Sequence, residues 1–209
     1  HHTMGKSYES DPRYSGAGVL APASKADLAF VEHMAYHMAD DGRVAVLLPH
    51  GVLFRGGAEE KIRRYLIDTL NCIDAVIGLP ANMFHGTSIP VCVLVLKKNR
   101  NGNSENICFI DAAAYYTAGT NQNIITDEDI DRIVSAYVNR KPVDKFCHIA
   151  TKDEIRNNGY NLNIPRYVDT FEEEEEIDLK ANRLALADIE KREQEAVERA
   201  NELLAQLGL

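Results

Sequence analysis

The sequence predicts an α/β fold built on a doubly wound sheet, and two observations support this prediction. Apolar runs rich in Val and Ile lie at residues 44–48, 73–77 and 91–96. Such runs are typical of strands that are covered on both faces. Residues 58–70, between the first two runs, place apolar side chains along one stripe of a helix. A strand, a crossover helix and a second strand form the unit of an α/β sheet.

Residues 79–90, between the second and third runs, show no helical period. We therefore expect those two strands to be antiparallel neighbours joined by a functional loop. The loop carries an aromatic ring, an imidazole and two hydroxyls, at Phe84, His85, Thr87 and Ser88. Residue types alone favour a structural role, in which Phe84 plugs the end of the sheet and the hydroxyls satisfy turn backbone. The alternative is that Phe84 is a platform for a planar ligand.

The composition fits one globular domain with an extension: 209 residues, 45% hydrophobic and 26% charged. No apolar run approaches the roughly 20 residues of a membrane span. The four cysteines form no C-x-x-C pair, so buried free thiols of a reducing cytosol are a better interpretation than zinc or disulfides. These cysteines are Cys72, Cys92, Cys108 and Cys147. We therefore expect a cytoplasmic protein.

Most of the net charge of -9 lies near the carboxyl terminus. From Asp169 onward there are thirteen acidic and five basic residues, whereas the rest of the chain carries 19 acidic and 18 basic residues. A near-neutral body is a poor electrostatic match for DNA. If nucleic acid is the substrate, another component must supply most of the affinity.

Two short motifs have weak chemical signals. His33 and His37 are four residues apart, but the Glu of an H-E-x-x-H zinc motif is absent, so we expect no metal site. The glycine pair at 56–57 could belong to a phosphate-binding loop, yet Ala58 and Glu59 follow it in place of the Lys and Ser or Thr of a P-loop. A strained turn before a packed helix is the preferred interpretation.

Capping signatures predict three further helices. Ser24 begins one that runs to about Ala39, and Thr126 and Thr151 precede the others. The apolar residues that the first helix is expected to bury are Leu28, Phe30, Val31, Met34, Ala35 and Met38. Those expected to be buried by the second are Ile130, Ile133, Val134 and Tyr137. A further strand is expected at 106–111.

The chain is expected to end in a long helical arm. Residues 172–206 contain no Gly or Pro, and the run at 172–176 is expected to be a solvated helix entry. The apolar residues of this arm follow a three-four rhythm that Glu193 interrupts, at Leu186, Ile189, Ala196, Ala200, Leu203 and Leu207. A helix with one narrow apolar seam must pack on a partner or on its own copy. We divide the chain into a tag remnant (1–5), a body (6–168) and the arm (169–209).

Several blocks of the chain, in order, resemble a known family. They are GVLAPASKADLAFVEHM, GRVAVLLPHGVLFRGGAEEKIRRYL, IDAVIGLPANMFHGTSIPVCVLVLKK, FIDA and NLNIPRYVD. Together they are similar to the carboxyl-terminal half of the DNA-methylating (modification) subunit of type I restriction-modification systems. The likeness covers nearly everything from Asp11 to Asp169, and the terminal helix resembles the one that joins such subunits to the DNA-specificity subunit.

The resemblance implies a truncated, Rossmann-like methyltransferase sheet followed by a helical arm. Family members transfer a methyl group from S-adenosylmethionine to the exocyclic amine of a flipped-out adenine in DNA. Their Gly-rich cofactor motif and their Asn-Pro-Pro-aromatic motif are both absent from this sequence. We therefore assign no catalytic or cofactor-binding residue here, and we expect the chain alone to bind no cofactor and to be inactive.

The resemblance also favours a ligand-binding role for the 79–90 loop. In related adenine methyltransferases this loop offers an aromatic face to the extruded base, and Phe84 occupies the matching place. Extrusion costs a few kcal/mol, and stacking on an aromatic ring returns about 1 to 3 kcal/mol. Phe84 would bind the base without reacting. Residues that would face DNA are His85, Thr87, Ser88, Arg55 and Arg166; for the two arginines, a solvated surface position is the competing interpretation.

The expected partners are the DNA-specificity subunit, the restriction subunit and, in the assembled complex, DNA. Missing strands would pair beside residues 43–48, so we expect a bare apolar edge there and self-association through that edge or through the arm. A competing hypothesis is a non-catalytic α/β assembly module, natively of this length, that binds protein partners through its body and terminal helix.

Overall fold

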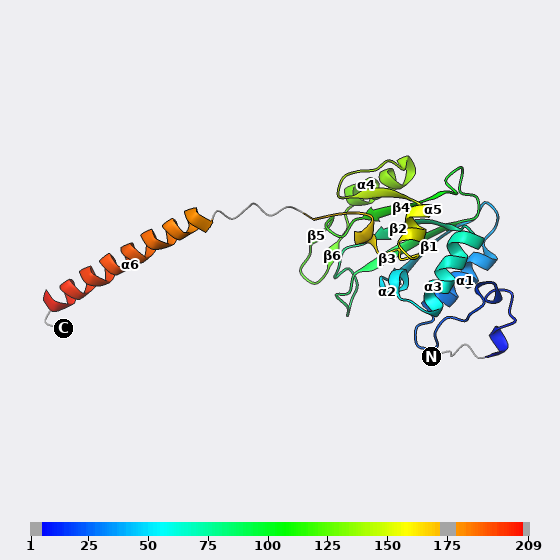
Figure 1. Cartoon of the computed structure of the whole chain (residues 1–209), viewed down its shortest axis with the longest axis horizontal. Helices are drawn as coiled ribbons and strands as arrows, with labels where there is room; N and C mark the ends of the chain where they lie inside the picture. The colour runs from blue at the N-terminus through cyan, green and yellow to red at the C-terminus, as the bar shows by residue number, and fades with distance from the viewer. Residues whose placement is uncertain (1–5, 172–178, 207–209) are drawn as a thin grey trace. The chain divides into compact units, whose positions relative to one another are not determined.

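The computed structural model describes residues 6–171 and 179–206. The chain divides into two compact units, His1–Thr170 and Phe171–Leu209, of which the second contains the helix α6 (Leu179–Gln206). The expected tag remnant and the acidic run at 172–176 lie outside the described residues. Figure 1 shows the elements of each unit.

The described part of the first unit contains a main sheet, a two-stranded hairpin and a set of α-helices. The strands are β1 (Arg43–Pro49), β2 (Ile73–Gly78), β3 (Val91–Lys97), β4 (Asn106–Asp111), β5 (Thr117–Ala118), β6 (Asn123–Ile124) and β7 (Cys147–Thr151). The helices are α1 (Asp27–His37), α2 (Gly51–Phe54), α3 (Ala58–Arg64), α4 (Asp127–Asn139) and α5 (Lys152–Asn157). Short turns are η1 (Lys6–Tyr8), η2 (Ser15–Ala17), the π-helical η3 (Tyr65–Thr69) and η4 (Ile164–Arg166).

The main sheet is mixed and has the strand order β1-β3-β2-β4-β7. β3 is antiparallel to both of its neighbours, with Val93 opposite Leu47 of β1 and Ile77 of β2. β2 and β4 are parallel, and β7 is antiparallel to β4. The antiparallel pairing of the second and third predicted strands is therefore confirmed.

Helices cover both faces of this sheet, which confirms the α/β prediction (Figure 1). Side chains from α1, α2, α3 and α5 pack on one face and form the larger core. Its members from the sheet are Leu48, Ile73, Val76, Cys92, Leu94, Leu96, Ile107, Phe109 and Ala150. α4 packs on the other face and forms a smaller core with Ile133 and Ala136.

β1 is not covered on both faces among the described residues. Leu48 is 6% exposed, whereas its neighbour Leu47 is 50% exposed. The reason is positional: β1 lies at the sheet edge, and the core under α4 is built on β2, β4 and β7. β2, in the middle of the sheet, is buried throughout as predicted.

Two helices bury different side chains from those predicted. α1 begins at Asp27 without a side-chain cap, and its Phe30 is 62% exposed because the buried stripe runs through Leu28, Val31 and Ala35. In α4, Ile133 and Ala136 are buried, while Ile130 and Val134 are about half exposed at 47% and 49%. The apolar side chains of both helices outnumber the positions that face a core.

α3 buries two charged residues, Glu59 and Arg63. Arg63 is 2% exposed because its guanidinium donates to the carbonyls of Tyr160, Val52 and Arg55 at 2.7–3.0 Å. Glu59 is buried against Arg55. Arg63 therefore fastens α3 to α2 and to the segment after α5.

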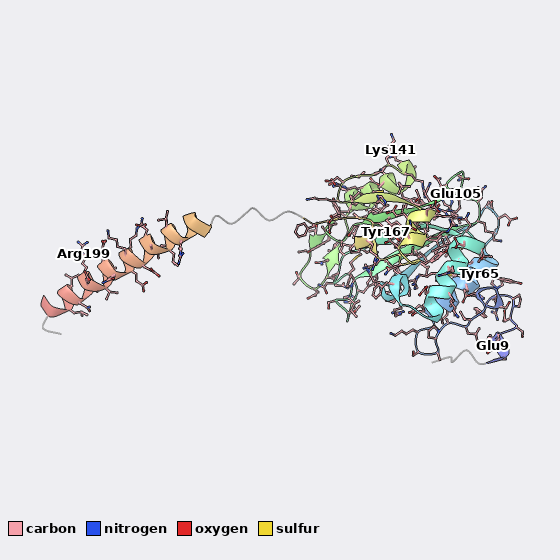
Figure 2. All side chains as sticks on the ribbon, viewed as in Figure 1. Glu9, Tyr65, Glu105, Lys141, Tyr167 and Arg199 are labelled. Carbon is pink, nitrogen blue, oxygen red and sulfur yellow. The ribbon has the colours of Figure 1, made fainter. Side chains whose placement is uncertain are left out.

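Other predicted features have the expected form. Thr126 and Asp129 make a capping box at the start of α4, and Thr151 caps α5. All four cysteines are buried thiols. Tyr167, labelled in Figure 2, stacks on Phe109 with ring centroids 3.9 Å apart. None of the helices in the described ranges is both long and apolar enough to cross a membrane. The sequence did not predict α2, β7 or the hairpin β5–β6.

Candidate functional site: an aromatic loop at the end of β2

The loop at residues 79–90 leaves the carboxyl end of β2 and returns into β3. Its base is closed by a hydrogen bond from the Leu79 amide to the Val91 carbonyl at 3.0 Å. Phe84 is 40% exposed, and His85 and Ser88 are also exposed. The loop therefore presents these three side chains at the surface, and Phe84 does not lie in either core.

A tight turn displays the Phe84 ring. The Thr87 amide donates to the Phe84 carbonyl at 3.4 Å, and Gly86 adopts a φ of 77°, which costs glycine little because it has no Cβ. The Thr87 hydroxyl accepts a hydrogen bond from the Ile89 amide at 3.2 Å. Thr87 is thus a turn-stabilising residue, as the structural interpretation of the loop proposed, while Phe84 stays accessible.

An open hollow of about 360 Å³ lies beside the ring. It is lined by Leu47, Leu48, Pro49, Phe84, Thr87, Ile89 and Val91. Six of these side chains are apolar and Thr87 supplies a hydroxyl, so the hollow suits an apolar or planar group. The bare half of β1 supplies one of its walls.

The two arginines with predicted DNA contacts lie in different surroundings. Arg55 is paired with Glu59 at 2.6 Å and with Asp27 at 3.3 Å, and these carboxylates raise its pKa above the usual value, the Glu59 hydrogen bond most strongly. Its charge is therefore largely neutralised within the protein. Arg166 is exposed at the end of η4, a turn that packs against β2 and β4.

Two residues that the sequence analysis did not single out contact the loop. The side chains of Gln122 and Asn123, from the hairpin β5–β6, donate hydrogen bonds to the backbone carbonyls of Met83 and Ala81, respectively. The signal that could have found them is topological: the hairpin follows β4, the parallel neighbour of β2, so both segments leave the same edge of the sheet.

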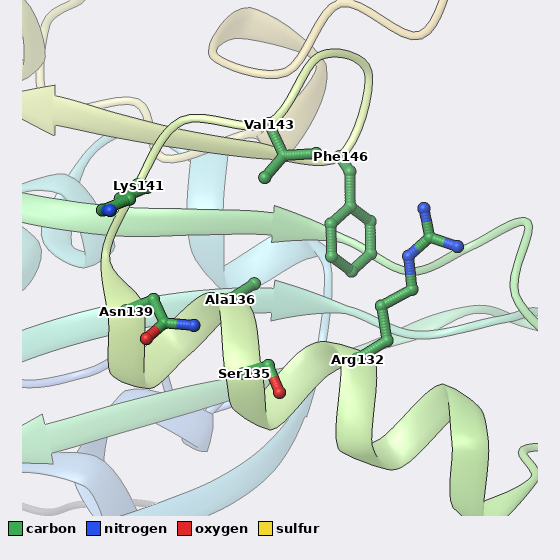
Figure 3. A pocket seen from close by; sticks show the side chains of 7 residues that line it. All are labelled: Arg132, Ser135, Ala136, Asn139, Lys141, Val143 and Phe146. Carbon is green, nitrogen blue, oxygen red and sulfur yellow. The ribbon is translucent and has the colours of Figure 1, made fainter.

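A second hollow, of about 310 Å³, lies between α4 and the segment that follows it (Figure 3). Arg132 lies over the Phe146 ring at 5.0 Å and over the Tyr115 ring at 4.3 Å. Its charge is thus directed at aromatic faces. The other lining residues are Ser135, Ala136, Asn139, Lys141 and Val143.

The described residues contain no group of three His, Cys, Asp or Glu side chains that could hold a metal ion. The His33 and His37 rings are 4.5 Å apart, and Arg13 contacts the Nδ1 of His33 at 3.3 Å. The glycine turn after β1 is followed by Glu59, whose carboxylate is occupied by Arg55.

Comparison with known proteins identifies the family. Residues 2–176 match the family model described as N-6 DNA Methylase. The chain belongs to this family. Over 171 residues it is 42% identical to the MpnII type I restriction enzyme methylase subunit of Mycoplasma pneumoniae, covering 82% of this chain and 31% of that protein. It is 35% identical over 185 residues to the MjaVII methylase subunit of Methanocaldococcus jannaschii, covering 87% and 32%.

Solved structures of type I restriction-modification methyltransferase subunits have a similar fold. The methyltransferase subunit of the type I restriction-modification system from Streptococcus thermophilus is 54% identical, with a TM-score of 0.76, and the match covers 79% of this chain and 35% of that chain. The EcoKI M protein shares the fold at 20% identity, with a TM-score of 0.58 and coverage of 73% and 40%. This chain spans about a third of the length of the curated relatives it matches.

Proposed function

We propose that this chain forms the carboxyl-terminal part of a type I restriction-modification methylase subunit that methylates the N6 atom of adenine in DNA with S-adenosylmethionine. In this proposal the loop after β2 receives the target base, and Phe84 stacks on it. His85, Ser88 and Arg166 face DNA, Thr87 shapes the turn, and Arg55 supports the adjoining helices. The chain alone is inactive.

The exposed Phe84 ring beside an apolar hollow is the observation that carries the proposal. A large ring is normally buried, because leaving it in water forfeits roughly 1.5 to 3 kcal/mol. Here the ring is 40% exposed at the end of a buried strand, beside an apolar hollow, on a loop with a closed base. These features suit a face that a planar group covers on binding.

The test is made in the complete methylase, assembled with its partner subunits, with Phe84→Ala. We expect methylation to fall by roughly five- to 150-fold, because stacking is worth about 1 to 3 kcal/mol per base, while the affinity for S-adenosylmethionine stays unchanged. Phe84→Tyr and Phe84→Trp keep an aromatic face and should retain activity, whereas Phe84→Leu should not.

Phe30→Ala is the matched control, since Phe30 is also an exposed aromatic residue but lies on α1. Unchanged methylation in Phe84→Ala would return Phe84 to a structural role. Tight binding of S-adenosylmethionine by the isolated chain in calorimetry would overturn the assignment of this chain to the carboxyl-terminal part.

The proposed partners are the DNA-specificity subunit, the restriction subunit and DNA, in the cytoplasm. The exposed apolar residues of α6 support a protein-binding role for the arm. They include Leu186, Ile189, Val197 and Leu203, each more than half exposed. The body carries little net charge, which agrees with DNA affinity supplied mainly by another subunit.

A further inference from the structure

We propose that the hairpin β5–β6 is a brace that sets the position of the Phe84 loop, with Gln122 and Asn123 as its positioning residues. The proposal rests on the function proposed above for what the loop does. The brace itself can be measured without it.

Three hydrogen bonds join the brace to three consecutive carbonyls of the loop. The side-chain amide of Asn123 donates to the Ala81 carbonyl at 2.9 Å, and its backbone amide donates to the Asn82 carbonyl at 2.8 Å. The side-chain amide of Gln122 donates to the Met83 carbonyl at 3.0 Å. The loop contributes only main-chain oxygens to these contacts. The side chains from residue 84 onward therefore remain available at the surface.

Two hydrogen bonds within the loop are longer than those from the brace. Asn82 donates to the Ser88 carbonyl at 3.3 Å, and the Phe84–Thr87 turn closes at 3.4 Å. Asn82 also adopts a φ of 56°, a left-handed conformation that Asn tolerates but does not prefer. The external bonds on both sides of Asn82 hold the backbone in this conformation just before the ring.

The brace is itself fixed at its tip. Gly119 donates to the Gln122 carbonyl at 3.0 Å, and a Cβ on Gly119 would lie 2.4 Å from that oxygen. Only glycine allows the two segments to approach this closely. The tight tip sets the direction in which Gln122 and Asn123 point.

Both ends of the brace are fastened to α4. Tyr115, just before β5, lies under the guanidinium of Arg132, whose packing against Phe146 is visible in Figure 3. Just after β6, the Thr126–Asp129 capping box begins the helix. α4 packs on the sheet. The Phe84 loop is therefore held to the sheet in two ways: directly by β2, from which it continues, and indirectly by the hairpin, which follows β4 and is attached to α4.

Tryptophan fluorescence can test the brace in this chain, because the sequence contains no tryptophan and Phe84→Trp introduces a single one. In that background, Asn123→Asp with Gln122→Glu keeps side-chain shape but replaces the two donors by carboxylates that face carbonyl oxygens. Asn121→Asp with Thr120→Asp is the control, since it adds the same charge at exposed positions of the same turn.

We expect amide hydrogen exchange at residues 82–88 to become about tenfold faster in the brace variant, and acrylamide quenching of the introduced tryptophan to increase. The control should leave both unchanged, and exchange in α4 should not change in either variant. Loop exchange equal to that of the control would overturn the proposal. The single variant Asn123→Asp gives the same test if the double variant fails to fold.

Assays of the complete methylase separate this inference from the proposed function. If both are right, Asn123→Asp raises KM for DNA and leaves the affinity for S-adenosylmethionine unchanged, and it adds no further loss to Phe84→Ala. If exchange in the loop accelerates but methylation does not change, the brace stands and the stacking role of Phe84 fails. If the loop stays ordered, the brace fails whatever the methylation rate.

Discussion

Glu32 is a charged residue whose surroundings oppose its charge. It is 2% exposed in α1, and neither carboxylate oxygen has a hydrogen-bond partner among the described residues. Burial therefore raises the pKa of Glu32 from 4.5 to about 8. Its charge also contributes to a raised pKa at Tyr65, after the larger effect of burial. At neutral pH the folded protein holds Glu32 protonated.

This raised pKa predicts a pH-dependent stability. Above about pH 4.5 the unfolded chain ionises Glu32 while the folded protein keeps the proton, so the free energy of unfolding falls by up to about 1.4 kcal/mol per pH unit until about pH 8. Glu32→Gln removes this dependence. In urea unfolding, its stability relative to the unmodified chain should be higher at pH 8 than at pH 5 by roughly 2 kcal/mol or more.

Glu105→Gln is the control, since Glu105 is exposed and should show the same relative stability at both pH values. If Glu32→Gln shifted stability equally at pH 5 and pH 8, Glu32 would ionise normally in the folded protein.

Individual residues show where sequence reasoning succeeds and where it does not. Residue types favoured Phe84 as a plug at the end of the sheet, and only the family resemblance favoured an accessible ring; in the structure the ring is 40% exposed. Arg63 and Glu32 could not be predicted as buried, since their burial depends on carbonyls and helices far along the chain. Phe30 could not be predicted as exposed, because helical period fixes a stripe only to within one position.

At the scale of elements, Asp74 joins the centre of the sheet to α4. Its carboxylate accepts from Tyr137 at 2.5 Å and lies 3.2–3.3 Å from Arg100, Arg140 and Lys97. Burial alone would raise the pKa of Asp74, but the Tyr137 hydrogen bond and the three cations outweigh it and hold the pKa below its usual value. One buried anion thus ties β2, β3 and the end of α4 together.

Asp74→Asn should therefore be strongly destabilising. It leaves the buried Arg100 without its anion, and breaking a buried ion pair from one side costs about 3 to 5 kcal/mol. Urea unfolding at pH 7 measures the loss. Asp153→Asn, which removes an exposed pair with Arg156, should change stability by less than about 0.5 kcal/mol. A loss for Asp74→Asn no larger than this control would contradict the account.

The elements themselves were predictable in proportion to their length and apolar content. The strands of the sheet centre and the capped helices follow from runs and caps that are local in sequence. The hairpin β5–β6 was not predicted because each of its strands has only two residues, too few to show an apolar pattern, and is stabilised by contacts with the loop and α4. The contacts of Gln122 and Asn123 with the loop could not be predicted from sequence for the same reason.

At the scale of the whole molecule, ordered blocks of sequence identified the family, but they could not reveal which surfaces stay bare. The exposed side of β1 depends on where α4 packs, and α4 covers β2 and β4 instead. The prediction that the first unit is a partial methyltransferase domain and the second an association arm stays a prediction. The boundary between the two compact units at Thr170 allows this prediction to be tested by producing the first unit without the second.

The seam of α6 should make the chain self-associate. The helix has 28 residues, and its Leu186, Ile189 and Leu203 are each more than half exposed. Pairing two such seams removes these side chains from water and stabilises a helix that has little tertiary support within its own unit. In sedimentation equilibrium we expect the whole chain to associate with rising concentration, and the double variant Ile189→Ser, Leu203→Ser to stay monomeric. A chain ending at Thr170 should also be monomeric and keep its folded circular dichroism.

Leu47→Lys tests the alternative contact surface on β1. If this change abolished association and the α6 variant did not, the edge of the sheet would be the contact. A whole chain that is monomeric at every concentration would exclude both surfaces.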